Sequence, residues 1–390
     1  MDRTRRTLLL VTTLLAAFSC GKDDSPERPD ITVPVKEEGT SSSGTGESGN
    51  DGNLSLGDLA ALQGIKLGAA FTYGEYTGNK QIAEILTTEF KAVTFGNEMK
   101  HDAIVKTSGQ MDFTTADKMA GWAEQAGTEL FGHVLGWHSQ QQKFWLDTVI
   151  NQAKADSSTS PEEAVDAEFK RYVYAMVEHF DVYAWDVVNE TFADGGNGAF
   201  RTAATTQAGD HVFVWGSYYS STKEWVDRAF QYATEACKEY GKSPILYIND
   251  YNLETDAGKR KGLCDYAKGN PQVTGVATQM HIDMSTYNLK DKIKETLTAL
   301  VATGKMVRIA ELDIKATDLD AQAELYRYIF EQYLSIVPAE QRGGITFWGI
   351  NDKDSWVGEY NHPLLWSGAN YDKKPAYDAI YAYLSELAGN

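Results

Sequence analysis

The sequence predicts an α/β protein whose folded part is a single (β/α)8 barrel, the TIM-barrel architecture. Three observations support this fold. Eight short β-rich apolar runs occur along the chain, helix-period stretches lie between them, and no glycine-rich loop follows the first run, Ile65–Ala70. Strands alternating with helices indicate parallel strands joined by crossover helices, and eight such strands close a barrel. An open doubly wound sheet is the alternative, but that fold is expected to carry a GxGxxG loop after its first strand.

The predicted elements follow one another regularly. The strands are Ile65–Ala70, Ala92–Phe95, Leu130–Leu135, Val182–Val188, Ile245–Ile248, Gly275–Met280, Val307–Leu312 and Ile345–Ile350. Helix periodicity is clearest over Glu162–Val177, Glu224–Tyr240, Lys290–Val301, Ala321–Leu334 and Ala376–Leu387. Trp122 and Trp225 fall inside helical patterns, so we expect both in the core.

The N-terminus is predicted to be a targeting segment that precedes the folded domain. Three arginines lie before the apolar stretch Leu8–Phe18, which is too short to span a bilayer, so residues 1–19 are predicted to be a signal peptide. Cys20 follows in a context that resembles the lipobox of bacterial lipoproteins, and Lys22-Asp23-Asp24 resembles the acidic export signal of Bacteroides-like surface lipoproteins. We therefore expect lipidation at Cys20 and location at the cell surface or outer membrane. Ordinary secretion with an incidental cysteine is the alternative.

A flexible tether is predicted between the signal peptide and the barrel. Residues 20–53 are acidic and rich in Gly and Ser, a composition that cannot bury enough apolar area to offset chain ordering. No second linker of this kind occurs later, so residues 54–390 are predicted to form one folded domain. We expect the protein to be a monomer.

Composition excludes several classes of function. The formal net charge is −19, which disfavours nucleic-acid binding because that binding depends on Lys and Arg neutralising phosphates. Three cysteines cannot build a disulfide framework for 390 residues, and Cys237 and Cys264 lie in helical patterns where buried thiols are expected. No zinc or EF-hand calcium pattern is present, so we predict no metal and no cofactor.

Polar residues gather where the predicted strands end, which is the active-site face of a barrel. They follow seven strands in succession, and no fold needs so many charges at its own rim. They are Asn97, Glu98, Lys100, His133, Trp137, His138, Gln140, Asn189, Glu190, Asn249, Asp250, Gln279, His281, Glu311, Asp313, Trp348 and Trp356.

Two of these residues predict the chemistry. Glu190 and Glu311 lie at the ends of the fourth and seventh predicted strands, which face each other across the mouth of a barrel. Hydrolysis of a glycosidic bond requires two carboxyl groups, one to protonate the departing oxygen and one to attack or to stabilise the anomeric centre. Tryptophans at strand ends fit this reading because the C–H face of a sugar stacks on an indole ring.

At these residues the chain resembles the endo-β-1,4-xylanases of glycoside hydrolase family 10. The resemblance runs from about Ile65 to Leu384. The motifs that carry it are Gly132-His133-Val134-Leu135-Gly136-Trp137-His138-Ser139-Gln140, Trp185-Asp186-Val187-Val188-Asn189-Glu190, Ile248-Asn249-Asp250-Tyr251-Asn252, Gln279-Met280-His281, Glu311-Leu312-Asp313, Phe347-Trp348-Gly349, Asp354-Ser355-Trp356, Pro363-Leu364-Leu365-Trp366 and Lys374-Pro375-Ala376-Tyr377.

The resemblance implies a retaining enzyme that hydrolyses xylan, with Glu190 as acid/base and Glu311 as nucleophile. His281 would bond the nucleophile, Asp313 would support that histidine, and Asn189 would bond the 2-hydroxyl of the sugar at the reacting bond. The residues implied in substrate binding are Asn97, Lys100, His133, Trp137, His138, Gln140, Gln279, Trp348 and Trp356. Xylan and xylo-oligosaccharides would be the partners.

Two further expectations concern the chemistry and the glycone side. Because Glu190 has to hold a proton and Glu311 has to be ionised, we expect an apolar or anion-adjacent setting for Glu190 and a hydrogen-bonded one for Glu311. The family usually has a sugar-binding glutamate where this chain has Gly96, which predicts weaker glycone binding or room for a substituted sugar. A barrel glycosidase acting on β-glucan, and a non-hydrolytic lipoprotein that captures xylan, remain alternatives.

Overall fold

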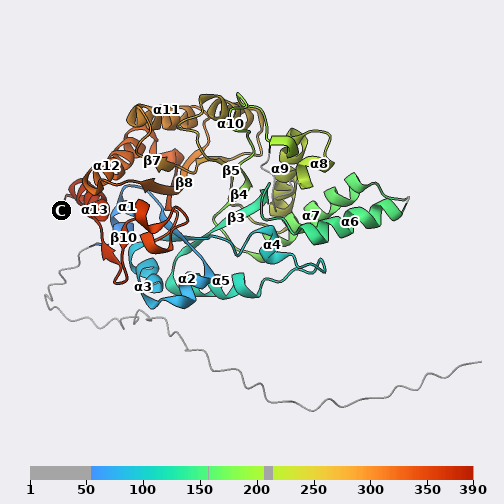
Figure 1. Ribbon diagram of the computed structural model, residues 1–390, viewed down its shortest axis with the longest axis horizontal. Coiled ribbons are helices and arrows are strands. Elements are labelled where there is room, and N and C mark those ends of the chain that lie inside the picture. Colours follow the sequence, from blue (N-terminus) through green and yellow to red (C-terminus); the bar gives the residue numbers. More distant parts are fainter. Residues whose placement is uncertain (1–53, 157, 206–213, 390) are drawn as a thin grey trace, which may run out of the picture. The chain divides into compact units, whose positions relative to one another are not determined.

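The computed structural model describes residues 54–389 except 157 and 206–213 (Figure 1). The predicted signal peptide, Cys20 and the tether lie outside the described residues. The strands are β1 (Leu67–Phe71), β2 (Ala92–Phe95), β3 (Glu129–Trp137), β4 (Ala184–Asn189), β5 (Ile245–Asp250), β6 (Gly275–Thr278), β7 (His281–Asp283), β8 (Met306–Lys315), β9 (Arg342–Phe347), β10 (Trp366–Ser367) and β11 (Asp372–Lys373).

Helices precede, connect and follow these strands. The α-helices are α1 (Leu56–Leu62), α2 (Tyr73–Gly78), α3 (Lys80–Glu89), α4 (His101–Ile104), α5 (Thr114–Ala126), α6 (Lys143–Ala155), α7 (Pro161–His179), α8 (Val214–Tyr218), α9 (Thr222–Glu239), α10 (Ala257–Gly269), α11 (Leu289–Val301), α12 (Leu319–Ile336) and α13 (Pro375–Ala388). Short 3-10 turns are η1 (Ala203–Thr205), η2 (Ala339–Gln341), η3 (Asp352–Asp354) and η4 (Glu359–Asn361). Among the described residues, no helix combines the length and apolarity that crossing a membrane requires.

Eight parallel strands close into a barrel, as the sequence predicted. The order β6-β5-β4-β3-β2-β1-β9-β8 is completed by pairing of β6 with β8, where Gly275 lies opposite Met306 and Thr278 opposite Ile309. The short β7 continues the path of β6 and pairs with the end of β8. Helices α10 to α13 follow one another along the outside of the strands (Figure 1). The open-sheet alternative is therefore wrong.

Most predicted strand boundaries differ from the structure by about one to three residues, and two of the differences illustrate the cause. The sixth run was expected to continue to Met280, but β6 ends at Thr278 and Met280 takes a left-handed backbone conformation with φ of 63°. The last strand starts at Arg342 rather than Ile345 because its first residues pair with β8, and Arg342 donates hydrogen bonds to the main chain of Gln63 and Leu334. These are tertiary contacts, which the apolar pattern does not record.

The bottom of the barrel interior is filled by one large side chain. A Cβ atom on Gly275 or Gly343 would lie 2.4 Å or less from atoms of the buried Tyr247 side chain of β5, so both strands carry glycine there. The guanidinium of Arg308 lies 3.9 Å from the centre of the Phe131 ring and donates to Tyr183. This packed interior leaves the chemistry to the strand ends.

The outer layer of the core lies between strands and helices. Trp122 and Trp225 are 3% and 0% exposed within it, as predicted from their helical positions. Cys237 and Cys264 are buried free thiols, which confirms the expectation for both. Helix α7 starts at a capping box formed by Ser160 and Glu163, with Pro161 in its first turn, so its position in the sequence is locally specified.

Candidate active site

Glu190 lies directly after β4, and its backbone is fixed by neighbouring segments. Its φ of 57° places it in the left-handed region, which is uncommon for a residue with a side chain. The Glu190 N–H donates to the main-chain oxygen of Asn249 at 2.9 Å, and the Glu190 main-chain oxygen accepts from Arg201 Nε at 2.9 Å. These bonds turn the Glu190 side chain out of the strand path and hold it at the mouth.

The carboxylate of Glu190 has hydrogen-bonding neighbours rather than the apolar or anion-adjacent setting that we expected. His138 Nε2 lies 2.8 Å from Glu190 Oε2, and Gln279 Nε2 donates to Glu190 Oε1 at 3.1 Å. Burial by itself would raise the pKa of Glu190, but hydrogen bonds from His138 and Gln279 and the charge of His138 lower it to about 2. The expectation was wrong because His138, 52 positions earlier in the chain, reaches this carboxylate only in the folded barrel.

Glu311 occupies an enclosed, hydrogen-bonded position on β8, as expected. Its side chain is 5% exposed. Asn249 Nδ2 donates to Glu311 Oε1 at 2.8 Å, and His281 Nε2 lies 3.3 Å from Glu311 Oε2. Both oxygens therefore face nitrogen atoms of neighbouring side chains, which fix the orientation of the carboxyl group.

His281 is held between two carboxylates. Its Nδ1 lies 2.8 Å from Asp313 Oδ2, which also accepts from Trp356 Nε1 at 2.9 Å. Burial lowers the pKa of His281, but the charges and hydrogen bonds of Asp313 and Glu311 outweigh burial and raise it to about 10. At neutral pH His281 is thus an imidazolium that donates from both ring nitrogens.

One polar framework connects Glu190 with Glu311. Asn249 accepts the N–H of Glu190 through its main-chain oxygen and donates its amide to Glu311. Gln279 donates its amide to Glu190 and to Asn189 Oδ1, while its main-chain oxygen accepts the N–H of Glu311 at 3.0 Å. The two glutamates, far apart in sequence, are therefore fixed relative to one another by shared partners.

Lys100 organises the adjoining wall. Its ammonium donates to Gln140 Oε1 at 2.8 Å and to Asn97 Oδ1 at 3.2 Å, and it lies 4.7 Å from the centre of the Trp137 ring. Burial lowers the pKa of Lys100, and the charges of Glu311 and Glu190 oppose that shift. The influence of both glutamates places this buried cation in the field of the candidate catalytic pair.

His133, Asp186 and Trp348 form a third part of the site. Asp186 was not among the predicted site residues. His133 Nδ1 lies 2.8 Å from Asp186 Oδ2, and the rings of His133 and Trp348 are 5.3 Å apart. Burial raises the pKa of Asp186, while the hydrogen bond and charge of His133 oppose that shift. A charged residue inside the apolar β4 run was the available signal for Asp186. Asn249 was recognised among the polar residues at the strand ends, but the sequence assigned it no role in the site.

His133, Asp186 and Glu311 form a cluster of potential metal ligands. Among the described residues, His133, Asp186 and Glu311 each offer one ligand atom, and these atoms lie within 4.8 Å of one another. However, His133 and Asp186 already pair with each other, and Glu311 is bonded by Asn249 and His281. These bonds engage His133, Glu311 and one oxygen of Asp186, while Asp186 Oδ1 is buried with no hydrogen-bond partner among the described residues.

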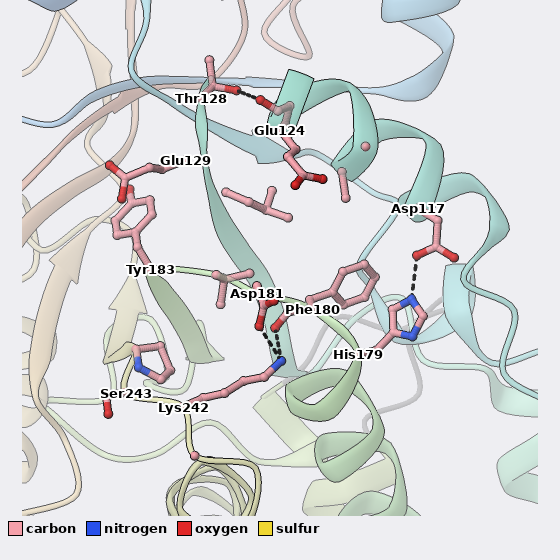
Figure 2. A pocket seen from close by; sticks show the side chains of 17 residues that line it. Asp117, Glu124, Thr128, Glu129, His179, Phe180, Asp181, Tyr183, Lys242 and Ser243 are labelled. Carbon is pink, nitrogen blue, oxygen red and sulfur yellow. Dashed lines mark hydrogen bonds and ion pairs between the residues drawn. The ribbon is translucent and has the colours of Figure 1, made fainter. Parts of the chain in front are cut away.

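A hollow at the opposite end of the barrel has a different character. It measures about 880 Å³ and is bordered by residues near the N-terminal ends of β3, β4 and β5. Figure 2 shows two side-chain pairs at this hollow. Lys242 lies 2.8 Å from Asp181, and His179 lies 2.6 Å from Asp117. The N-terminal face of such barrels carries stability rather than catalysis, so the site remains with Glu190 and Glu311.

The fold and site together define a class of protein. The (β/α)8 barrel holds two glutamates, one after β4 and one on β8, on the same face of the barrel. Exposed and half-buried tryptophans lie beside them. This is the arrangement of a barrel glycoside hydrolase. The chain belongs to glycosyl hydrolase family 10, whose profile matches residues 55–383.

Individual relatives agree with this assignment. Endo-beta-1,4-xylanase Xyn10C of Cellvibrio japonicus is 31% identical over 341 residues, which cover 78% of this chain and 52% of the relative. Endo-1,4-beta-xylanase A of Cellvibrio japonicus strain Ueda107 is 30% identical over 371 residues, covering 84% of this chain and 56% of the relative. The chain thus spans about half the length of these curated relatives.

Solved structures are similar over most of the chain. Xylanase 10B from Thermotoga petrophila in complex with xylobiose has a TM-score of 0.71 and 29% identity, covering 87% of this chain and 99% of that one. The CBM22-1 and GH10 modules of Clostridium thermocellum xylanase 10B, complexed with xylohexaose, have a TM-score of 0.74 and 25% identity, covering 85% of this chain and 67% of theirs.

Proposed function

We propose that this chain is an endo-β-1,4-xylanase that hydrolyses internal bonds of xylan with retention of configuration. The observation that carries the proposal is the paired setting of Glu190 and Glu311 on one hydrogen-bonded framework, in a family whose similar members are named endo-xylanases. Glu311 is the nucleophile, because it lies enclosed at the mouth of the barrel and His281 and Asn249 fix both of its oxygens.

Glu190 acts as the general acid and then as the general base. In the first step Glu311 attacks the anomeric carbon while Glu190 gives its proton to the departing oxygen, and in the second step Glu190 removes a proton from the attacking water. The contact with His138 bears on this role, because His138 Nε2 lies 2.8 Å from one oxygen of the carboxyl group that has to give and take this proton.

The walls of the site have supporting roles in this proposal. Asn189 and Gln279 position sugar hydroxyls and Glu190, and Asp313 keeps His281 protonated toward Glu311. Lys100, Asn97, His133, His138 and Gln140 bind sugar hydroxyls, while Trp137, Trp348 and Trp356 supply the faces on which sugar rings stack.

The test is product analysis of the purified protein on glucuronoxylan and arabinoxylan, with Glu311→Ala beside it. Wild type is expected to release xylo-oligosaccharides and the variant none. Glu190→Ala should lose far more rate on a xylan bond than on an aryl xylobioside with a good leaving group, because that departure needs no acid. Folded protein that releases nothing from either xylan would refute the proposal.

One similar protein suggests a second candidate specificity, hydrolysis of β-glucan. One relative, 28% identical over 319 residues, is named Exoglucanase XynX of Acetivibrio thermocellus. Barley β-glucan and carboxymethyl-cellulose therefore belong in the same assay, and faster hydrolysis of either than of xylan would reassign the substrate. Binding of xylan with no hydrolysis by wild type would instead indicate a capturing protein.

We also propose that the chain is anchored as a surface lipoprotein through Cys20. The support is the sequence of the leader and the acidic residues after Cys20. Radiolabelled palmitate should enter the wild-type protein and not Cys20→Ser in the native host. Equal labelling of both proteins would contradict lipidation at this position.

A further inference from the structure

A separate hollow adjoins the candidate catalytic centre on the side of β1, β2 and β9. It measures about 240 Å³, and the side chains around it include Thr72, Glu75, Asn97, Lys100, Trp348 and Trp356. Its volume is below the roughly 300–1,000 Å³ typical of drug-sized ligands, so it suits a short stretch of sugar. Lys100 and Trp356 also belong to the site described above, so a chain bound across Glu311 has direct access to this hollow.

Gly96 borders this hollow, and its backbone does not require glycine. Its φ lies outside the left-handed region. The atoms nearest to an added Cβ would be Thr72 Cγ2 at 3.2 Å, a tight contact that would require Thr72 to shift slightly, and Phe71 main-chain atoms at 3.6 Å or more. The Gly96 N–H donates to the Phe71 main-chain oxygen at 2.8 Å, as any residue other than proline could. The effect of glycine at this position is therefore the space that it leaves above Thr72.

Three carboxylates lie in or beside the hollow, and their hydrogen bonding differs. Glu98 accepts from Tyr73 N–H at 2.7 Å with one oxygen and from Asn97 N–H at 3.2 Å with the other. Both oxygens of Asp354 are also engaged, by Lys353 and by the Tyr371 hydroxyl.

Glu75 differs from the other two. Its Oε2 accepts from the N–H and the hydroxyl of Thr72, which caps helix α2. Its Oε1 has no hydrogen-bond partner among the described residues, and the side chain lines the hollow. A half-buried carboxylate oxygen beside two tryptophans is suited to accept from sugar hydroxyls while the ring stacks on an indole.

We propose that Glu75 accepts hydrogen bonds from a neutral sugar unit of bound xylan, and that Gly96 leaves the space through which this unit reaches Glu75. The inference rests on the proposed function, which it deepens by naming a specificity-determining residue. A neutral unit is favoured over a uronic acid because Glu75 and Asp354 both line the hollow.

The first test measures affinity for xylohexaose by calorimetry in the inactive Glu311→Ala background. Adding Glu75→Gln should weaken binding about tenfold, because it replaces a charge-assisted acceptor with a neutral amide that can still cap α2. Glu98→Gln is the matched control, since it also removes a carboxylate near α2 but Glu98 does not line the hollow, and its affinity should change less than twofold.

A double-mutant cycle tests the part assigned to Gly96. Gly96→Val should weaken binding when Glu75 is present and add little in the Glu75→Gln background, since both changes remove one interaction. Circular dichroism checks that each variant is folded, and if Gly96→Val is not, the comparison of Glu75→Gln with Glu98→Gln decides.

The outcomes are distinct. Equal affinity for Glu75→Gln and Glu98→Gln overturns the assignment of Glu75 while leaving xylan hydrolysis untouched. Fully additive losses in the cycle overturn the part assigned to Gly96. If wild type neither hydrolyses nor binds xylohexaose, the proposed function fails and this inference fails with it.

Discussion

Replacement of Asp313 by asparagine should give the catalytic site a new pH dependence. In the wild type, His281 donates to both Asp313 and Glu311, and its pKa rises from 6.5 to about 10. That rise corresponds to about 5 kcal/mol in favour of the imidazolium, at about 1.4 kcal/mol for each pH unit.

Asp313 raises the pKa of His281 more than Glu311 does. Its charge is the main cause that raises the pKa of His281, and its oxygen lies at 2.8 Å, compared with 3.3 Å for Glu311. If Asp313→Asn removes at least half of the stabilisation, the pKa of His281 falls to about 8 or below. At pH 9 only about one tenth of the variant would then carry the imidazolium that donates to Glu311.

The raised pKa of His281 sets the direction in which activity changes with pH. A cationic His281 is present below its pKa and is lost as the pH rises through it, so the variant loses activity through about pH 8 while the wild type keeps the cation until about 10. The assay is the pH–rate profile of an aryl xylobioside with a good leaving group, which isolates attack by Glu311 from acid catalysis. Between pH 6 and pH 9 the variant should lose about tenfold in kcat/KM, which reports the attack step, beyond any wild-type loss.

Trp356→Phe provides the control for this experiment. It removes the 2.9 Å hydrogen bond to Asp313 but keeps the Asp313 charge, so the new basic limb should be absent or much smaller. If Asp313→Asn keeps the wild-type limb while it stays folded at pH 9, the charge of Asp313 does not set the state of His281 and the reasoning is wrong.

Two further predictions concern other parts of the barrel. His138→Phe should raise the pKa of Glu190 from about 2, because burial then acts without the hydrogen bond and charge of His138; carbon-13 NMR titration of the Glu190 carboxyl measures this, and an unmoved pKa would contradict it. Gly132→Ala should lower the free energy of unfolding by about 1–3 kcal/mol or more, because its Cβ would lie 2.1 Å from the Trp185 ring. Denaturant unfolding should show no such loss for Gly121→Ala, a helical glycine with nothing within 4 Å of an added Cβ, and equal effects at the two positions would count against the packing argument.

Local patterns in the sequence determined the fold class and the chemical groups of the candidate site. Strand and helix periodicities reflect the face that each segment buries, so eight runs and their intervening helices can be read without knowing how they meet. The positions of Glu190 and Glu311 at strand ends were visible for the same reason. The alternation pattern also marked Trp122 and Trp225 as core residues, and both are buried.

The tertiary structure alone decided which of these groups touch. The approach of His138 to Glu190 reversed the expected setting of that carboxyl, and the dual bonding of Asn249 to both glutamates had no local signal. The open acceptor on Glu75 beside Gly96 likewise depends on how β1, β2 and β9 meet. The physical reason is that periodicity reports the burial of each segment, whereas hydrogen bonds and pKa values depend on distances between segments that only the closed barrel sets.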